Sequence, residues 1–142
     1  MKNKFTATSS IVINAPATKV WDALTNPALI KQYLFGTEAT SEWKEGSSIT
    51  YKGEWDGKAY EDKGTILKIV PEEILVTTYF SNVSGLEDVP ENYNTVSYIL
   101  TSEGEGTKLT ITQDNIVSEE SAKHSENNWS GVLKMMKGLL EK

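Results

Sequence analysis

The chain has 142 residues, of which 38% are hydrophobic and 24% are charged, a composition typical of a globular domain that excludes a chain too polar to fold. A chain of this length buries roughly two thirds of its surface on folding, so we expect a single domain over residues 1–142. Its 14 basic residues are all lysines and its net charge is −6, which argues against nucleic acid as a partner.

The sequence lacks cysteine and several motifs that particular classes of protein require. It has no cysteine, which excludes disulfides, thiolate metal sites and cysteine nucleophiles. No run of about 18 apolar residues could span a bilayer, and no apolar signal core follows the N-terminal lysines. We therefore expect a cytoplasmic protein without membrane insertion. No His, Asp or Glu cluster has metal-ligand spacing, and no phosphate-binding glycine loop is present, so no cofactor is expected.

The first 36 residues predict a strand followed by two short helices. The segment FTATSSIVIN is rich in β-branched residues and ends at Asn14, shortly before Pro16. Apolar residues then recur at helical spacing up to Pro27, where a second start signal, Asn26 before proline, opens another short apolar stripe that ends at Gly36.

Between Ser41 and Asp114 the hydrophobic period changes to two, which predicts a series of antiparallel strands. The alternation is plainest in the segment SITYKGEW. Three turn signals separate the strands, and the segment GLEDVPENYN over residues 85–94 reads as a loop. The turns are expected at Asp56-Gly57, at residues 71–73 and at Glu105-Gly106.

The last segment predicts a long helix from Ser118, as N-cap, to Lys142. Acidic residues lie in its first turn and lysines towards its end, which suits the helix dipole. A helix of about 24 residues would be roughly 36 Å long. Its single apolar stripe consists of Trp129, Val132, Leu133, Met136, Leu139 and Leu140.

This order of elements resembles the START-like or SRPBCC superfamily, which includes the birch pollen allergen. The segments INAPATKVWDALTNPALIKQYL, WKEGSSITYKGEW, KGTILKIVPEEIL and NNWSGVLKMMKGLLEK are similar to the group named after the activator of heat-shock protein 90 ATPase. The resemblance implies an α+β helix-grip fold, in which a curved antiparallel sheet wraps around the C-terminal helix. It also assigns Trp21, Trp43, Gly46 and Trp129 to architectural positions.

In this superfamily the space between sheet and helix often becomes a ligand cavity, so we expect binding of a small apolar, aromatic or lipid-like molecule there. Glycine opposite aromatic residues leaves room, methionine adapts its shape, and tyrosine hydroxyls can fix a polar atom. Plain core packing is the alternative for each residue. The expected ligand-binding residues are Tyr33, Tyr51, Gly53, Trp55, Trp129, Leu133 and Met136. The facing of Ile74 to Phe80 stays open.

Two further functions remain alternatives. The family name implies a chaperone partner, but the eukaryotic activator carries an additional N-terminal domain that this sequence lacks, so the co-chaperone role ranks second. A cyclase-like or hydratase-like enzyme using the same cavity ranks third, because no catalytic constellation stands out. The one histidine, His124, and the adjacent acids Glu61 and Asp62 are expected on solvated surfaces.

Overall fold

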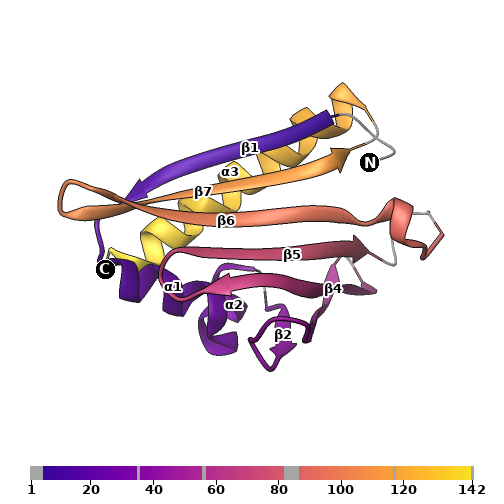
Figure 1. The fold of residues 1–142 in the computed structure, drawn as a ribbon, viewed down its shortest axis with the longest axis horizontal. Coiled ribbons are helices and arrows are strands. Elements are labelled where there is room, and N and C mark those ends of the chain that lie inside the picture. Colours follow the sequence, from indigo (N-terminus) through magenta and orange to yellow (C-terminus); the bar gives the residue numbers. More distant parts are fainter. Residues whose placement is uncertain (1–4, 35, 56, 82–86, 117, 142) are drawn as a thin grey trace.

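The computed structural model describes residues 5–34, 36–55, 57–81, 87–116 and 118–141. It confirms the α+β helix-grip architecture, with two short helices after the first strand and a long helix at the C-terminus (Figure 1). The elements are β1 (Phe5–Ile13), α1 (Ala17–Thr25), α2 (Pro27–Tyr33), β2 (Glu38–Ser41), β3 (Ser48–Trp55), β4 (Lys58–Val70), β5 (Ile74–Ser81), the 3₁₀ turn η1 (Pro90–Asn92), β6 (Asn94–Glu103), β7 (Gly106–Ile116) and α3 (Glu119–Leu140).

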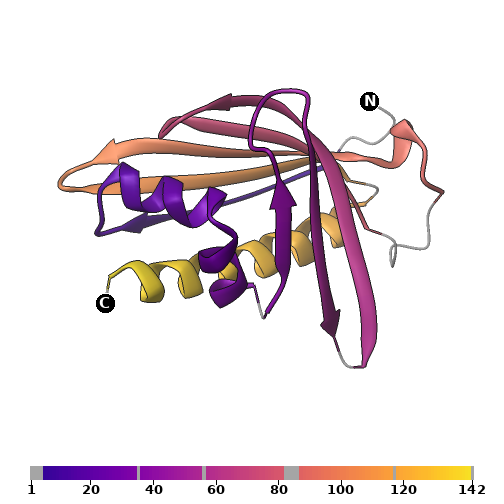
Figure 2. The same cartoon turned by 90° about the horizontal axis from the view of Figure 1, so that it is seen from below.

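The strands form one antiparallel seven-stranded sheet in the order β1-β7-β6-β5-β4-β3-β2. Neighbours from β2 to β7 follow each other in the sequence, and β1 joins at the β7 edge. The sheet is strongly bent, so β3 and β4 run across the direction of β6 and β7 (Figure 2). This bend turns one face of the sheet inward, towards α3.

The bend coincides with an irregularity between β4 and β5. Their register shifts between Ile66 and Lys68, which marks a β-bulge. At Gly64 a Cβ atom would lie only 1.8 Å from the backbone oxygen of Thr78, so only glycine allows this approach. The Thr78 hydroxyl fills the gap in the ladder by accepting a hydrogen bond from the Thr65 amide at 2.8 Å.

The two short helices begin and end at the predicted signals. Pro16 precedes α1, and the side chain of Asn26 accepts a hydrogen bond from the Ala28 amide, which caps α2. Pro27 occupies the first turn of α2, where it has no hydrogen bond to lose. The helices pack against each other, and the Tyr33 hydroxyl donates to the backbone oxygen of Ala23 at 2.9 Å.

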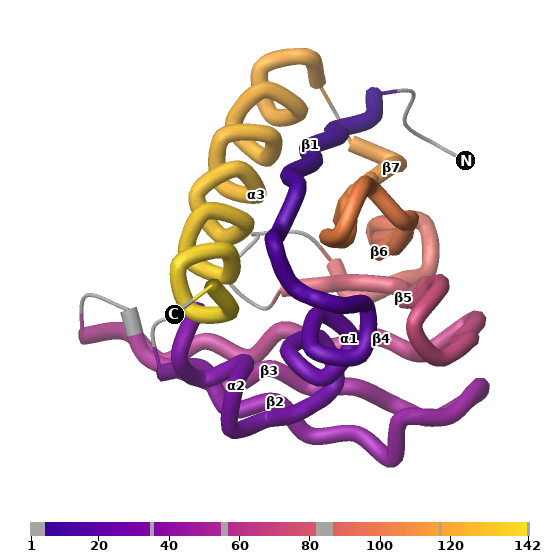
Figure 3. The backbone as a smooth tube through the Cα atoms, turned by 90° about the vertical axis from the view of Figure 1, so that its left-hand side faces the viewer, coloured from indigo at the N-terminus to yellow at the C-terminus, as the bar shows by residue number. Residues whose placement is uncertain are grey.

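The long helix α3 covers one end of the sheet. Ser118 caps it by accepting a hydrogen bond from the Ser121 amide, as predicted. Its 22 residues extend about 33 Å along β1 and β7 (Figures 1 and 3). Leu133 and Met136 are each only 1% exposed, whereas Trp129 is half-buried at the inner face. The predicted apolar stripe therefore faces the sheet.

Side chains of α3 also bind the backbone of β1. The Glu126 carboxylate accepts a hydrogen bond from the Thr8 amide at 3.2 Å, and the Glu141 carboxylate accepts one from the Asn14 amide at 2.7 Å. Lys137 donates to the backbone oxygen of Val12 at 2.8 Å. These bonds satisfy backbone groups of β1 that have no neighbouring strand.

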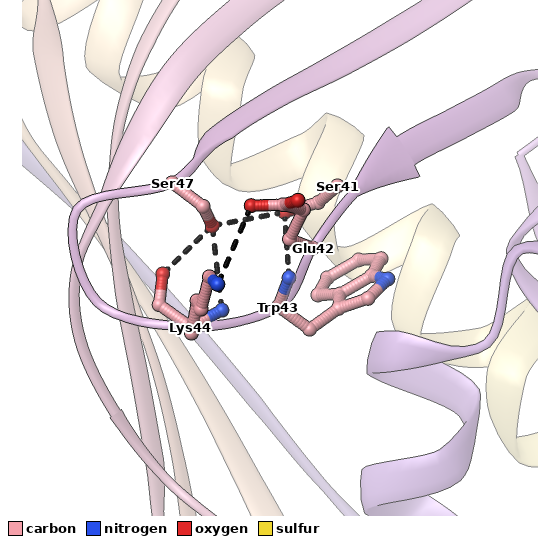
Figure 4. A network of polar contacts seen from close by, with 5 residues as sticks. All are labelled: Ser41, Glu42, Trp43, Lys44 and Ser47. Atoms are coloured by element: carbon pink, nitrogen blue, oxygen red, sulfur yellow. Dashed lines mark hydrogen bonds and ion pairs between the residues drawn. The ribbon is translucent and has the colours of Figure 1, made fainter.

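The turn between β2 and β3 places Trp43 against the core (Figure 4). Trp43 has a positive φ of 57°, which is uncommon for a residue with a bulky side chain. The Ser41 hydroxyl accepts a hydrogen bond from the Trp43 amide at 3.0 Å, and the Ser47 hydroxyl donates to the Lys44 backbone oxygen at 2.7 Å. Hydrogen bonds before and after Trp43 thus stabilise the turn that carries it.

The remaining turns agree closely with the sequence. Glu72 lies in the predicted β4–β5 turn. Trp55 pairs with Lys58 across the predicted Asp56-Gly57 turn, of which Asp56 lies outside the described residues. The last turn is centred one residue earlier than predicted, because Glu103 pairs with Gly106 and leaves Gly104 and Glu105 as the turn residues. In the predicted loop over residues 85–94, positions 85 and 86 lie outside the described residues, and η1 forms part of the rest.

Candidate functional site

The pairing of the strands defines which side chains share the inner face. Because directly paired residues project to the same side, the pair Tyr51 and Asp62 places both on the face that also carries the buried Ile49. On the neighbouring strands this face continues through Tyr79, paired with Asn94, and through Tyr98, paired with Ile111. Polar and aromatic side chains thus gather beside the apolar core.

Four tyrosines, Tyr33, Tyr51, Tyr79 and Tyr98, form what we call the tyrosine cluster. They come from α2, β3, β5 and β6, and their hydroxyls lie close enough to influence one another. Burial raises the pKa of every one of them well above the ordinary value, and for Tyr51 the neighbouring Tyr98 contributes next. All four therefore stay protonated as hydrogen-bond donors at physiological pH.

Asp62 places a carboxyl group at the margin of the tyrosine cluster. Its Oδ2 accepts a hydrogen bond from the Tyr79 hydroxyl at 2.9 Å. Its Oδ1 is buried and has no hydrogen bond of good geometry to any described residue. Desolvation raises the pKa of Asp62, and interactions with Ser81 and Tyr79 act in the opposite direction. The group is therefore a partly desolvated acid with one unsatisfied oxygen.

A hydrogen-bonded chain joins α3 to the sheet next to this cluster. The Trp129 indole donates to Gln113 Oε1 at 2.9 Å, and Gln113 Nε2 donates to Asn94 Oδ1 at 3.0 Å. The Trp129 ring also meets the Tyr98 ring edge to face, with ring centroids 6.0 Å apart. Trp129 is therefore oriented by two separate contacts.

The structure brings most of the predicted ligand-binding residues to this inner face. Tyr33, Leu133 and Met136 are buried in the core, while Tyr51 and Trp129 are half-buried against it. The Trp55 side chain lies outside the described part of the structure. A role for each of these residues in ligand binding remains a prediction.

The room expected beside Gly53 is occupied by an aromatic side chain. It pairs with Tyr60, and a Cβ atom on Gly53 would lie 2.5 Å from the Tyr60 hydroxyl. That hydroxyl in turn hydrogen-bonds the Thr37 side chain. The room beside Gly53 is thus taken by Tyr60, so a larger side chain at this position would first displace Tyr60 rather than fill empty space.

Three functional candidates were missed from the sequence. Tyr79 lies in the segment Ile74 to Phe80, whose facing the sequence left open, and the structure places Leu75, Thr77 and Tyr79 inward. Tyr98 in β6 was not among the expected ligand-binding residues. Asp62 was expected on the surface together with Glu61, but only Glu61 is exposed. The signal that could have found Asp62 is the predicted Asp56-Gly57 hairpin, whose two-residue turn fixes the register that sets Asp62 opposite Tyr51.

A pocket of about 370 Å³ lies away from the tyrosine cluster, beside the β4–β5 and β6–β7 turns and the start of α1. Its lining is mostly polar and includes the carboxylates of Glu72, Glu73 and Glu105. All three are exposed. It lacks the aromatic lining expected for an apolar ligand.

Metal-binding groups and membrane-spanning helices are two further features of interest. Within the described ranges, no three His, Asp or Glu side chains are grouped so that they could hold a metal ion. His124 is exposed on α3, as expected. None of the helices described here is long and apolar enough to cross a membrane.

Comparison with known families and structures gives a consistent result. The family described as "Activator of Hsp90 ATPase homolog 1-like protein" matches residues 14–141. The solution structure of ChR145 from Cytophaga hutchinsonii is 51% identical, with a TM-score of 0.85 over 99% of this chain and 97% of that one. No significant match was found among curated proteins.

More distant structures share the fold. The solution structure of the Aha1 dimer from Colwellia psychrerythraea is 20% identical, with a TM-score of 0.77 over 96% of each chain. Protein MLL2253 from Mesorhizobium loti is 22% identical, with a TM-score of 0.79 over 96% of this chain and 97% of that one.

Proposed function

The chain belongs to the activator of Hsp90 ATPase homolog 1-like family, and from this premise we propose that it binds a small apolar or aromatic molecule between the sheet and α3. The tyrosine cluster carries the proposal. Tyr51, Tyr79 and Tyr98 come from three strands onto one inner face, and all three side chains are half-buried and keep accessible surface. Side chains that are deep in a fold but still accessible are typical of the lining of an internal cavity.

The placement of α3 supports the same proposal. Its backbone approaches β1 most extensively and β7 next, while the tyrosine cluster draws its strand residues from β3, β5 and β6. The helix therefore fills the inner face at one end of the sheet and leaves the tyrosines of the other strands to be covered by side chains or by a ligand. Figure 3 shows α3 on the β1 side, away from β2 and β3.

The expected affinity is modest. An apolar cavity with a few hydroxyl groups offers few strong anchors, so we expect dissociation constants in the micromolar range, on the order of −8 kcal/mol. A panel of flavonoid, fatty-acid and sterol-like compounds should include members that raise the melting temperature. Native mass spectrometry of the purified protein would identify a bound compound directly.

Chemical-shift mapping would locate the bound compound. Amide signals of Tyr51, Tyr79 and Tyr98 should shift on binding, while the amide of Leu67, whose side chain is 50% exposed, serves as a distant control. Shifts at Ser102 and Gly104 instead would place the compound in the polar pocket near the hairpin turns and contradict the proposal. The absence of any thermal or spectral response to the whole panel would also contradict it.

A chaperone partner is the second candidate, and family membership is the observation that favours it. The direct test is the ATPase turnover of heat-shock protein 90 with increasing amounts of this protein. We expect no stimulation, because the acidic chain has no arginine with which to clamp a partner's carboxylates or phosphates. A reproducible, concentration-dependent increase in turnover would make the co-chaperone role the leading one.

A further inference from the structure

Asp62 is the one carboxyl group of the inner face for which the described residues provide no balancing cation. The lysines next to it in the fold pair with other acids: Lys52 lies 3.8 Å from Glu61, and Lys63 pairs with Asp88. Asp62 itself takes part in none of the ion pairs of the described chain. Its Oδ1 is left without a well-formed hydrogen bond, which carries a desolvation penalty.

Asp62 interacts with the hydroxyls of Tyr79 and Ser81 and lies beside further tyrosines, and no described cation pairs with it. Tyr79 binds its Oδ2, Tyr51 is its cross-strand partner, and Tyr98 lies next to both tyrosines. The faces of aromatic rings attract cations, and a carboxylate beside them adds a direct charge. The net charge of −6 favours the approach of a cation to the protein as a whole.

We propose that the molecule bound between the sheet and α3 is an organic cation, a protonated amine on an aromatic or apolar body, whose ammonium group binds Asp62. This inference rests on the proposed binding function and specifies its ligand class. The ammonium supplies the positive charge that Asp62 lacks among the described residues and a donor for its Oδ1, while the body of the ligand packs on the tyrosine cluster.

Other ligand charges fit this site less well. A carboxylate or phosphate would meet the negative charge of Asp62 with no arginine to hold it. A neutral lipid would leave Oδ1 unsatisfied. Asp62 as a whole is half-buried, but its Oδ1 is buried, so a neighbouring side chain must move before an ammonium can reach that oxygen.

A charge series on one scaffold tests the inference. Isothermal titration calorimetry at pH 7 would compare 2-(1-naphthyl)ethylamine, 2-(1-naphthyl)ethanol and 1-naphthylacetate, which carry positive, neutral and negative groups on the same ring system. We expect the amine to bind about tenfold more tightly than the alcohol, and the acid to bind most weakly.

The variant Asp62→Asn should reduce the tenfold advantage of the amine over the alcohol to less than about twofold. The matched control is Glu61→Gln, which removes the same charge from the adjacent residue on the exposed face. In this control the amine should keep its advantage. Circular dichroism would confirm folding, and Asp62→Ser would replace the asparagine variant if that variant does not fold.

The outcomes separate the two proposals. Equal binding of amine and alcohol to the unmodified protein, or an amine advantage that survives Asp62→Asn, would overturn the cation inference and leave the binding function standing. If neither compound binds and the wider panel also gives no response, the binding function fails together with the inference.

Discussion

The two ends of the sheet differ in how their inner faces are covered. Where β1 and β7 meet α3, the interface consists of closely packed apolar side chains such as Ile13, Leu109 and Leu133, each at most 1% exposed. Where β3, β4 and β5 curve away from the helix, the inner face combines buried residues such as Ile49 with Tyr51, Asp62 and Tyr79, which keep accessible surface.

This difference indicates that the two ends of the sheet contribute differently to stability and to binding. Apolar packing at the helix-covered end supplies stability, because buried methyl groups contribute most of the folding free energy. The tyrosine end retains polar groups that weaken the core but can recognise a ligand. Substitutions at the helix-covered end should therefore lower stability more than binding, and substitutions at the tyrosine end should lower binding more than stability.

The largest loss of stability is expected from Leu133→Ala at the helix-covered end. Removing this buried side chain should lower the free energy of unfolding by about 3 kcal/mol, measured by urea denaturation. The matched control is Met135→Ala on the same helix, because Met135 is 41% exposed. It should change stability by less than about 0.5 kcal/mol. Similar losses for both variants would contradict the placement of α3.

Trp129→Ala should have the second largest effect, a loss of about 2 kcal/mol, because Trp129 is half-buried and its removal also leaves Gln113 without its indole donor. A fully buried ring would cost more, about 3 to 5 kcal/mol. Trp129→Phe would separate the ring from the hydrogen bond. A loss below about 1 kcal/mol for the alanine variant would show that α3 does not depend on this contact.

Asp62→Asn should stabilise the protein at pH 7, by roughly 1 kcal/mol. The pKa of Asp62 is raised in the fold by desolvation, so folding favours the protonated acid and the charged form weakens the fold. This cost is absent below the pKa of the unfolded chain and grows as the pH rises through the folded pKa. Asparagine is neutral at every pH and can still accept the bond from Tyr79.

The pH dependence of the melting temperature checks whether Asp62→Asn is stabilising. Differential scanning calorimetry should show the higher melting temperature of Asp62→Asn at pH 7 and a shrinking difference as the pH falls, when Asp62 in the unmodified protein becomes protonated. The groups facing Asp62 are Tyr51, Tyr79 and Ser81, none of which titrates between pH 4 and 7. A variant less stable than the unmodified protein at pH 7 would contradict the prediction.

The smallest effect on stability is expected from Tyr98→Phe, less than about 0.5 kcal/mol, because the ring contact with Trp129 is kept. Its effect on binding should be larger, since the hydroxyl lies on the half-buried inner face beside Tyr51. We expect roughly threefold weaker binding by calorimetry for a ligand identified from the panel. Unchanged binding would remove Tyr98 from the candidate site.

Most of the fold was predictable because local signals and hydrophobic periods agree with one another. Ser118, Asn26 and Pro27 mark helix starts in the sequence and in the structure. The stripe containing Leu133 and Met136 fixes the buried side of α3. The family resemblance added the curvature of the sheet, which periodicity does not encode.

The polar part of the candidate site was harder to predict, because burial of an acid contradicts the usual preference of aspartate for the surface. Adjacent acids such as Glu61 and Asp62 point to opposite faces of a strand, so one of them had to face inward. The parity of β5 was ambiguous because both Tyr79 and Phe80 are large, and the structure places them on opposite faces, Phe80 stacked on Tyr93. Register, rather than residue type, decides these positions.

The bonds from α3 to β1 have a consequence for contacts between copies of the chain. The backbone groups of an edge strand are a template to which a strand of another molecule can add, and this is a common route to aggregation. Glu126 and Lys137 already occupy such groups on β1, and Glu141 binds the amide of Asn14 directly after it. The opposite edge, β2, is only four residues long. The long helix therefore hinders the addition of a strand from another molecule at β1. A chain truncated before Lys137 would lose the bonds from Lys137 and Glu141 and keep only the one from Glu126.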